Sequence, residues 1–330
     1  MTLPLLQELN APVRIGIDLM GSDTPPLALI QTLLELAKNP LSPRFSVFLH
    51  PSLLSYFPSY FHLIPCSQTV HMQDDPKIAF KTKKESSLLI GLKYLAEGSI
   101  DGLISAGNTG ALVLSAKRIL PSLPGIERPS LLAQIPTQKN EIVVLDVGAN
   151  LTLKPRHMVQ LAKMGTAFQQ TCGIKFPTVG LLNIGIEPAK GTLQHRNSLK
   201  ELLSEMSICQ HFQGNVESQD VFNGKVDVVV TDGLMGNMFL KTAESAASFL
   251  LHKLFSLQEN TEYRSLITSF HTSLSSQEKR SAILCGTKGL IIKCHGNLTP
   301  LDLKYSIQRM TFLIQSQFFS SFCTHLLHLV

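Results

Sequence analysis

VDVVVTDGLMGNMFLKT, residues 226–242, is the segment around which the predicted fold is organised. It opens with an apolar, β-branched run, passes through a turn that contains Gly233 and Gly236, and continues into the helix-forming run AESAASFLLHKL. Such a run, bounded by glycine, is typical of a strand buried on both faces of a sheet. A strand that turns directly into a helix leaves free backbone N–H groups at its carboxyl end, which favour an anion. For one such turn alone, an ordinary connection in an α/β core is the better interpretation.

A second segment, IDGLISAGNTG at residues 100–110, follows the same pattern before the helical run ALVLSAKRIL. Both segments have Ile or Val followed by Asp, then apolar residues, then Ser or Thr, and then Gly-x-x-Gly. We interpret this as the same local geometry used twice rather than a sequence repeat, because the similarity ends with the turn. The pair predicts an anion site with two walls, one from each turn.

Further apolar runs alternate with helical patterns along the chain, and several of them end in Gly, Asn, Asp or Ser. This alternation predicts an α/β fold with a doubly wound, mostly parallel sheet and a site along the carboxyl edge of its strands. Several such turns in one chain favour a small-anion or phosphate site. The strands are expected at residues 14–18, 45–50, 100–105, 131–135, 142–146, 178–183, 226–230, 283–286 and 290–296.

The lysines of residues 77–84 form a cationic run, for which two interpretations stay open. One is an ordinary solvated face, and the other is a basic rim for phosphate or an acidic partner.

The composition limits the class of protein. The chain has 330 residues, 44% of them hydrophobic, and a net charge of +5 without a dense basic block, so no nucleic-acid partner is expected. Its 6 cysteines are scattered without CxxC spacing, which indicates reduced thiols in a cytoplasmic protein. We expect no secretory signal and no transmembrane helix. Nucleotide-binding, serine hydrolase and zinc protease motifs are absent from the sequence, and no cofactor or metal site is expected.

Seven motifs run in order along nearly the whole chain: IDLMGSD at 17–23, SAGNTGALV at 105–113, GIERP at 125–129, LDVGAN at 145–150, VGLLNIGIEPAKG at 179–191, GNVES at 214–218 and VVVTDGLMGNMFLKT at 228–242. With them the sequence closely resembles the bacterial phosphate acyltransferases of phospholipid synthesis, the PlsX family. SAGNTGAL and VTDGxxGNxxLKT are together highly specific.

The resemblance implies a reaction and a set of partners. Long-chain acyl-[acyl carrier protein] and inorganic phosphate would give acyl phosphate and free acyl carrier protein. A membrane glycerol-3-phosphate acyltransferase would then use the acyl phosphate. It also implies one domain over 1–330, a three-layer α/β/α sandwich related to the phosphate acetyltransferase and isocitrate dehydrogenase group. The expected protein is a cytoplasmic homodimer, either soluble or attached peripherally to the inner face of the cell membrane.

The matched motifs give hypotheses for site residues. Lys190, Asp232 and Asn237 are the predicted catalytic residues: a cation on phosphate or the oxyanion, a group that orients a donor or accepts a proton, and an amide donor. Asp232 is equally well interpreted as a cap on its turn. His295 matches a late His-Gly of the family, although a histidine at a strand end is more often structural. The predicted substrate-binding residues are Ser105, Gly107, Asn108, Thr109, Gly110, Asn150, Gly236 and His295.

Two stretches depart from the family pattern. Thr24 stands where the family has histidine, so an acid or base role for that histidine is not available in this chain. Residues 280–286, RSAILCG, lack two glycines and a proline of the family loop, which puts the conformation of that loop in question. A separate amphipathic segment, residues 248–274, is expected to form a dimer interface and, secondarily, to contact a membrane.

Three other functions compete with this one. The first is a phosphate acetyltransferase-like enzyme that uses acyl-coenzyme A, and the second is a non-catalytic, membrane-associated scaffold that keeps the fold. A decarboxylating dehydrogenase is disfavoured, because the sequence has neither clustered metal-binding aspartates nor a dinucleotide fingerprint.

Overall fold

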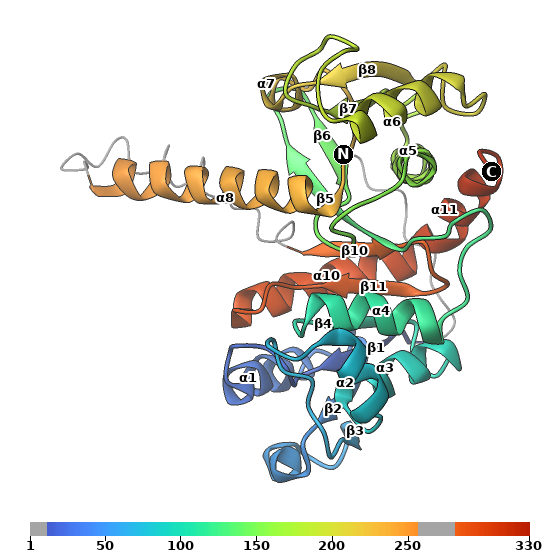
Figure 1. Cartoon of the computed structure of the whole chain (residues 1–330). Helices are drawn as coiled ribbons and strands as arrows, with labels where there is room; N and C mark the ends of the chain where they lie inside the picture. The colour runs from blue at the N-terminus through green and yellow to red at the C-terminus, as the bar shows by residue number, and fades with distance from the viewer. Residues whose placement is uncertain (1–11, 257–280) are drawn as a thin grey trace. The chain divides into compact units, whose positions relative to one another are not determined.

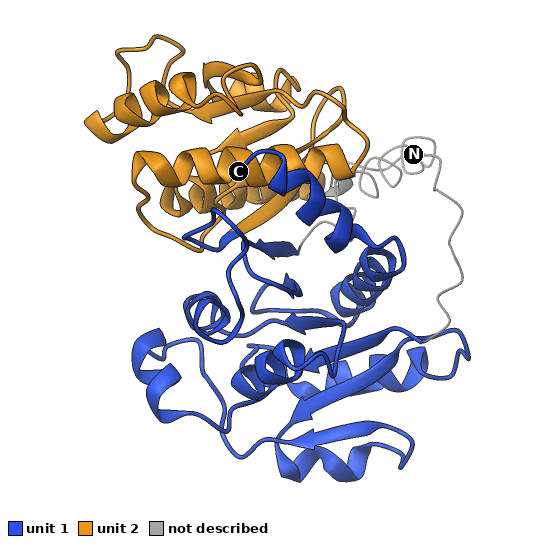
Figure 2. Ribbon diagram, turned by 90° about the vertical axis from the view of Figure 1, so that its right-hand side faces the viewer, with its two compact units in different colours: residues 1–130, 281–330 blue, residues 131–280 orange. Residues whose placement is uncertain are grey.

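The computed structural model describes residues 12–256 and 281–330 of the chain. The chain divides into two compact units, shown in different colours in Figure 2. Unit 1 comprises residues 1–130 and 281–330, and unit 2 comprises residues 131–280. Unit 1 is therefore assembled from both ends of the chain. The expectation of one functional domain over 1–330 stays a prediction.

The strands of unit 1 lie in the order β3-β2-β1-β4-β11-β10 (Figure 1). β1, β2, β3, β4 and β11 pair in parallel, and β10 is antiparallel to β11. Apolar residues such as Ile15 and Ile17 are buried because helices cover both faces of this sheet. The strands are β1 (Arg14–Asp18), β2 (Arg44–Leu49), β3 (His62–Pro65), β4 (Gly102–Ser105), β10 (Ala282–Cys285) and β11 (Leu290–Lys293).

Helices pack on the two faces of this sheet, and two adjacent residues of β4 show how. A Cβ atom on Gly102 would contact Met310 of α10, whereas Leu103 lies against Gly91 of α3. Successive strand residues point to opposite faces, so α3 and α10 lie on opposite sides and unit 1 has three layers. The helices are α1 (Pro26–Leu36), η1 (Pro51–Tyr56), α2 (Pro76–Thr82), α3 (Ser87–Ala96), α4 (Thr109–Ile119), α10 (Pro300–Gln315) and α11 (Phe318–Leu327).

The strands of unit 2 lie in the order β5-β6-β9-β7-β8. β6, β9, β7 and β8 are parallel to their neighbours, and β5 is antiparallel to β6. The strands are β5 (Ser130–Pro136), β6 (Glu141–Leu145), β7 (Val179–Leu182), β8 (Phe212–Val216) and β9 (Val228–Val230). The helices are α5 (Pro155–Thr171), α6 (Leu193–Ser204), α7 (Ser218–Phe222) and α8 (Gly233–Ser256).

Helix α5 packs directly on the centre of this sheet. Gly165 permits the contact, because a Cβ atom there would overlap Val228 of β9 and come within 3.1 Å of Leu145 of β6. The three valines of β9 are fully buried, as the sequence predicts for the strand at 226–230.

The predicted mixed α/β architecture with a mostly parallel sheet is confirmed. Most predicted strands begin or end within one or two residues of the observed ones, but residues 51–70, which show no periodicity, contain η1 and β3. The amphipathic segment at 248–274 belongs to α8 as far as Ser256, and its remainder lies outside the described residues.

Candidate functional site

The carboxyl ends of β6, β9 and β7 lie side by side in unit 2. Leu145 and Leu181 both pair with Val230, so the three strands end at nearly the same level. Because the strands are parallel, the loops that follow them begin at one edge of the sheet. These loops and the start of α8 carry the predicted residues Asn150, Lys190, Asp232, Gly236 and Asn237.

Asp146 is the anchor of the first loop, and it is fully buried. Its Oδ1 accepts hydrogen bonds from the backbone N–H groups of Leu131 (3.1 Å), Gly148 (3.1 Å) and Ala149 (2.9 Å). Its Oδ2 accepts from the backbone N–H (2.7 Å) and the side-chain amide (2.9 Å) of Asn150. Burial raises the pKa of Asp146, and these hydrogen bonds oppose that rise. The carboxylate therefore holds the 146–150 loop in a single conformation.

The start of α8 is fixed to this loop. The Asp232 carboxylate accepts a hydrogen bond from the N–H of Met235 (2.9 Å), so Asp232 caps the helix. The N–H of Gly233 donates to the carbonyl of Asn150 (2.8 Å). Of the two interpretations of Asp232, the cap is thus observed, and a role in chemistry stays a prediction.

Gly236 is required by packing. A Cβ atom at this position would overlap the carbonyl oxygen of Asp146 and come within 2.9 Å of the Thr231 side chain. Because backbone cannot move aside as a flexible side chain can, only glycine allows the first turn of α8 to lie this close to the end of β6.

Asn237 follows Gly236 and faces the same loop. A Cβ atom on Gly148, whose φ is +130°, would lie 3.6 Å from the side chain of Asn237. Among the described residues, the Asn237 amide has no hydrogen-bond partner, and the residue is half-buried. Its donors and acceptor are therefore available to a ligand.

The loop after β7 holds Lys190. The side-chain amide of Asn183 donates to the carbonyl of Lys190 (3.3 Å), and that of Asn215 donates to the carbonyl of Glu187 (3.0 Å). These two buried asparagines fix the backbone, whereas the Lys190 side chain is exposed. Within the described parts of the chain, the Lys190 ammonium has no partner.

In unit 1, the carboxyl ends of β1, β4 and β11 form a corresponding edge. Asp18 and Lys293 both pair with Ser105, so these three residues form one row across the sheet. All three side chains are buried. Residues opposite each other in register share a face of the sheet, so this row carries a carboxylate, a hydroxyl and an ammonium on one face.

The hydroxyl of Ser105 serves the turn itself. It donates to Asp18 Oδ2 (2.7 Å) and accepts from the N–H of Gly107 (3.2 Å). A Cβ atom on Gly107 would meet nothing nearer than 3.5 Å, so this glycine, unlike Gly236, is not required by packing. Burial raises the pKa of Asp18, opposed mainly by hydrogen bonds from Ser87 and Ser105.

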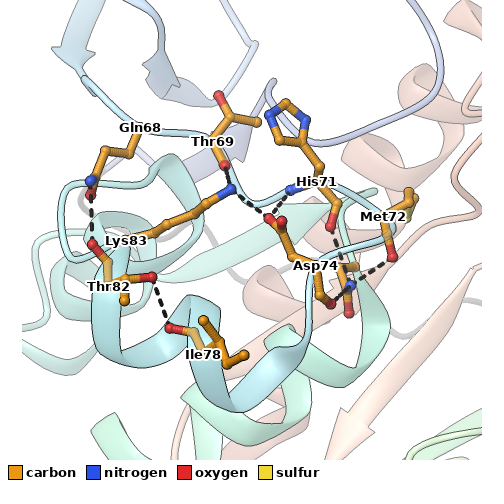
Figure 3. A network of polar contacts seen from close by, with 9 residues as sticks. Gln68, Thr69, His71, Met72, Asp74, Ile78, Thr82 and Lys83 are labelled. Carbon is orange, nitrogen blue, oxygen red and sulfur yellow. Dashed lines mark hydrogen bonds and ion pairs between the residues drawn. The ribbon is translucent and has the colours of Figure 1, made fainter.

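Asn108 caps α4 and joins it to a distant loop. Its Oδ1 accepts from the N–H of Ala111 (3.0 Å). Its Nδ2 is directed at the carbonyls of His71 (3.3 Å), Met72 (2.9 Å) and Asp74 (3.1 Å), part of the network in Figure 3. The side chain of Asn108 is therefore occupied within the protein, which leaves its backbone as the group that could serve a substrate.

Lys83, from the cationic run, belongs to the same network. Its ammonium donates to the carbonyl of Thr69 (2.7 Å) and pairs with the Asp74 carboxylate (2.6 Å), as Figure 3 shows. The hydrogen bond from Lys83 lowers the pKa of Asp74. Lys83 thus fixes the 68–74 loop, and the two interpretations of the remaining lysines stay open.

Three other predicted residues lie near these strand ends. Thr109 and Gly110 form the first turn of α4, and a Cβ atom on Gly110 would come within 2.7 Å of Pro76. His295 is half-buried and lies two residues after Lys293.

Thr24 and residues 281–286, from the two stretches that depart from the family pattern, belong to unit 1. The carbonyl of Thr24 accepts a hydrogen bond from Ser22 (2.9 Å), and the N–H of Asp23 donates to the carbonyl of Gly296 (2.8 Å). Residues 282–285 of the second stretch form β10, paired with β11.

Sequence reasoning missed three charged residues. Asp18, Asp146 and Lys293 received no role, although each ends or directly follows a buried apolar strand. That position is the signal that could have identified them. The predicted residues divide between the units: Ser105, Gly107, Asn108, Thr109, Gly110 and His295 belong to unit 1, and Asn150, Lys190, Asp232, Gly236 and Asn237 belong to unit 2.

In residues 12–256 and 281–330, no cluster of His, Cys, Asp or Glu could hold a metal ion. No helix in the same ranges is long and apolar enough to cross a membrane.

Known proteins resemble this chain over most of its length. A family model described as "Fatty acid synthesis protein" matches residues 13–321. The phosphate acyltransferase of Chlamydia pneumoniae is 40% identical over 309 residues, which cover 89% of this chain and 93% of the relative. That of Chlamydia abortus is 42% identical over 316 residues, with 92% and 96% covered.

Solved structures share the fold at low identity. A phosphotransacetylase from Streptococcus pyogenes superposes with a TM-score of 0.61 at 13% identity, over 94% of this chain and 95% of that one. A branched-chain phosphotransacylase from Enterococcus faecalis gives a TM-score of 0.55 at 15% identity, over 92% and 98% of the two chains.

Proposed function

This chain belongs to the phosphate acyltransferase family, and from that membership we propose that it transfers a long-chain acyl group from acyl carrier protein to inorganic phosphate. The product, acyl phosphate, would feed the acylation of glycerol 3-phosphate in phospholipid synthesis. The observation that carries the proposal is the edge of unit 2. There the Asn237 amide, which has no partner among the described residues, lies at the start of α8, and the exposed Lys190 ammonium lies on a loop fixed by hydrogen bonds from buried asparagines.

The proposed reaction is one addition and one elimination. A phosphate oxygen attacks the carbonyl carbon of the thioester, the C–O bond forms, and the carbonyl oxygen becomes an oxyanion. The oxyanion collapses, the C–S bond breaks, and the thiolate of the carrier leaves with the electron pair. Because a thiol has a pKa of about 8.5, this leaving group requires little help from an acid.

Lys190 and Asn237 suit the two charges in this reaction. The Lys190 ammonium would neutralise phosphate or the oxyanion, and the Asn237 amide would donate a hydrogen bond to the same oxygen atoms. Both side chains are free of partners among the described residues, whereas their backbones are fixed by Asn183 and by the turn at Gly236. Fixed donors need no reorganisation when charge develops, which is the condition for effective stabilisation.

The buried thiols and the Ser105 hydroxyl near the strand ends are poor nucleophiles, which agrees with a direct attack by phosphate on the thioester. Burial raises the pKa of the Cys66 and Cys285 thiols to about 12, so neither is a ready nucleophile. Burial also raises the pKa of Cys294. The Ser105 hydroxyl is buried and already bonded to Asp18. No covalent enzyme intermediate is required by the proposal.

The experiment is to measure phosphate-dependent consumption of long-chain acyl-acyl carrier protein by the purified chain, with acyl phosphate trapped by hydroxylamine. We expect trapped product only when phosphate is present. Acyl-coenzyme A at equal concentration tests the acetyltransferase-like alternative, and faster turnover of that donor would favour it. No trapped product from any acyl donor would favour the scaffold.

The role of Lys190 is tested by Lys190→Ala, with Lys200→Ala on the exposed face of α6 as the matched control. We expect kcat/KM to fall by about 100-fold in the first variant, the order found when one charge-stabilising group is removed, and to remain unchanged in the second. Unimpaired phosphate-dependent transfer by Lys190→Ala would remove Lys190 from the proposal.

We further propose that the chain acts as a homodimer that contacts the inner face of the cell membrane. Phe249, Leu250 and Leu254 of α8 are 60%, 59% and 41% exposed, which is unusual for large apolar side chains and supports an interface. Light scattering would give the oligomeric state, and co-sedimentation with anionic vesicles would test membrane contact. A monomer that stays in the supernatant would contradict both parts.

A further inference from the structure

Lys293 is a buried lysine that the proposed chemistry does not yet use. It ends β11 and is 7% exposed. Its ammonium donates a hydrogen bond to the carbonyl of Cys294, the next residue, so the side chain turns back over the carboxyl end of its own strand. Among the described residues it has no other hydrogen bond and no ion pair. An ammonium has three N–H donors, so two of them remain without a partner.

This arrangement is energetically unfavourable for the protein alone. Transfer of an ammonium from water into a protein interior is costly unless a partner of opposite charge and several hydrogen bonds replace the lost hydration. One neutral carbonyl replaces little of it. A ligand that accepts hydrogen bonds from the two remaining N–H donors of Lys293 would therefore bind strongly.

The groups around Lys293 favour an anion as that ligand. Lys293 shares a row with Ser105 and Asp18, on the face of the sheet where α3 lies, and the Asp18 carboxylate is hydrogen bonded to Ser87 in the first turn of that helix. Helix α4 begins four residues after Ser105. The N-terminal ends of two helices thus approach the row, and such ends carry partial positive charge and free N–H groups.

A second buried donor lies nearby. The hydroxyl of Ser86, which precedes α3, is fully buried and has no hydrogen-bond partner within the described residues. It is adjacent to Ser87, which contacts Asp18. The acidic groups close to Lys293 are the Asp18 and Asp23 carboxylates and the Cys294 thiol, and burial raises the pKa of that thiol, which favours its uncharged form. Asp18 is occupied by neutral donors, namely Ser87, Ser105 and the N–H of Met20, and it makes no ion pair with Lys293 among the described residues.

We infer that Lys293 is a phosphate-binding residue, which holds an oxyanion at the carboxyl ends of β1, β4 and β11 together with the amides that open α4. The identification of the anion as inorganic phosphate rests on the proposed function, whereas the presence of an anion site rests on unit 1 alone. In this assignment Asp18 holds the Ser105 turn in place through its hydrogen bond with the Ser105 hydroxyl. Lys293 supplies the positive charge that binds the anion, because the turn itself has none.

The titration of Lys293 agrees with this assignment. Burial lowers the pKa of the ammonium to about 8, and the Cys294, Asp18 and Asp23 groups only partly offset that effect. A bound phosphate would stabilise the charged form and raise the pKa again. Phosphate binding at pH 9 should therefore be accompanied by proton uptake.

The test measures the binding of inorganic phosphate to the full chain without any acyl donor. Thermal unfolding with increasing phosphate and calorimetric titration at pH 9, in two buffers of different ionisation enthalpy, are run on the wild type, Lys293→Met and Lys288→Met. Lys288 is the matched control, because it is exposed and lies in the connection between β10 and β11.

For Lys293→Met we expect phosphate affinity to fall by about tenfold or more and the proton uptake to disappear, as for the loss of one charge-assisted contact. The control should keep both. Affinity within about twofold of the wild type, or unchanged proton uptake, would overturn the assignment. If Lys293→Met does not fold, Lys293→Gln is measured in the same way, and phosphate binding by it at wild-type strength would overturn the assignment too.

Kinetic measurements distinguish a failure of this inference from a failure of the proposed function. With the acyl donor saturating, Lys293→Gln should raise KM for phosphate by about tenfold and leave KM for the donor unchanged. If the wild type forms no acyl phosphate but phosphate binding still depends on Lys293, the proposed function fails and the anion site stands. If acyl phosphate forms at the same phosphate KM in both proteins, the proposed function stands and the anion site fails.

Discussion

The carboxyl edges of the two units deal with buried charge in opposite ways. In unit 2 the buried charge is Asp146, and backbone and side-chain N–H donors from four residues occupy both of its oxygens. In unit 1 the buried cation is Lys293, and within the described part of the chain a single carbonyl accepts a hydrogen bond from it. A fully satisfied charge rigidifies its surroundings, whereas an under-satisfied one favours a ligand. The first edge is thus built to hold exposed groups in place, and the second to take up charge.

The largest expected effect is a difference in stability between alanine substitutions at Gly236 and Gly107, one glycine from each of the two similar turns. Gly236→Ala in unit 2 should lower the free energy of unfolding by about 3 kcal/mol, because the new Cβ atom meets the backbone of Asp146. Gly107→Ala in unit 1 should change it by less than about 1 kcal/mol, because its Cβ atom has room. Urea unfolding of both variants gives the comparison, and equal costs would show that both turns are equally crowded.

The second prediction concerns pH. The pKa of Lys293 is about 8 in the folded chain and near 10.5 when unfolded, so between these values the unfolded state binds more protons. Stability should therefore rise with pH from 8 to 10.5, by about 3 kcal/mol at most, and the cost of the buried charge is complete below pH 8.

Lys293→Met tests this pH dependence directly. The variant should be more stable than the wild type at pH 7, because an apolar side chain replaces a poorly paired charge. The difference should shrink as the pH approaches 10.5. Phosphate should also reduce the pH dependence of the wild type. Chemical denaturation across this range provides the measurement, and a variant less stable than the wild type at pH 7 would contradict the comparison between the two edges.

The third prediction contrasts two asparagines. Asn108→Ala should cost about 2 kcal/mol of stability, because it removes a helix cap and leaves the carbonyls around it without their donor. Asn237→Ala should cost less than about 0.5 kcal/mol, because its amide has no partner among the described residues, but it should lower kcat by about 100-fold if that amide binds the substrate as proposed. Thermal unfolding and acyl phosphate formation are measured on both. A full-activity Asn237→Ala protein would move the chemistry away from unit 2.

The smallest expected effect is at Asp232. Asp232→Ala removes the cap of α8 and should lower stability by about 1 kcal/mol, whereas Asp232→Asn keeps a capping oxygen and should restore most of that loss. If Asp232 also takes part in the reaction, Asp232→Asn will be stable but slow. Measuring stability and kcat on the same two proteins separates the cap from the chemistry.

Local sequence patterns predicted the elements well but not the partners of polar residues. The apolar run at 226–230 and the glycine turn after it led correctly to β9 and α8. Asn108, by contrast, was predicted to serve a substrate, and its side chain is occupied by carbonyls of residues 71–74. Those carbonyls reach it through tertiary structure, and no pattern around residue 108 reports them.

The sequence did not predict the row of Asp18, Ser105 and Lys293 in unit 1, for a related reason. Asp18, Ser105 and Lys293 meet only because β1, β4 and β11 pair in one register, and β11 comes from the far end of the chain. A single sequence does not fix the register between distant strands. What it does show is the position of each charge, at the end of an apolar strand, and that observation is sufficient to nominate such residues.

The origin of β11 also determines when unit 1 is completed during synthesis. β4 pairs with β1 on one side and with β11 on the other, and β11 lies in residues 281–330, which the ribosome makes after all of unit 2. Until they emerge, one side of β4 is an open edge that favours pairing with other chains. All of unit 2, residues 131–280, is synthesised before that point and is the first whole unit available to fold. A chain truncated near residue 280 should therefore retain unit 2 and lose unit 1, although it contains every residue of the N-terminal strands.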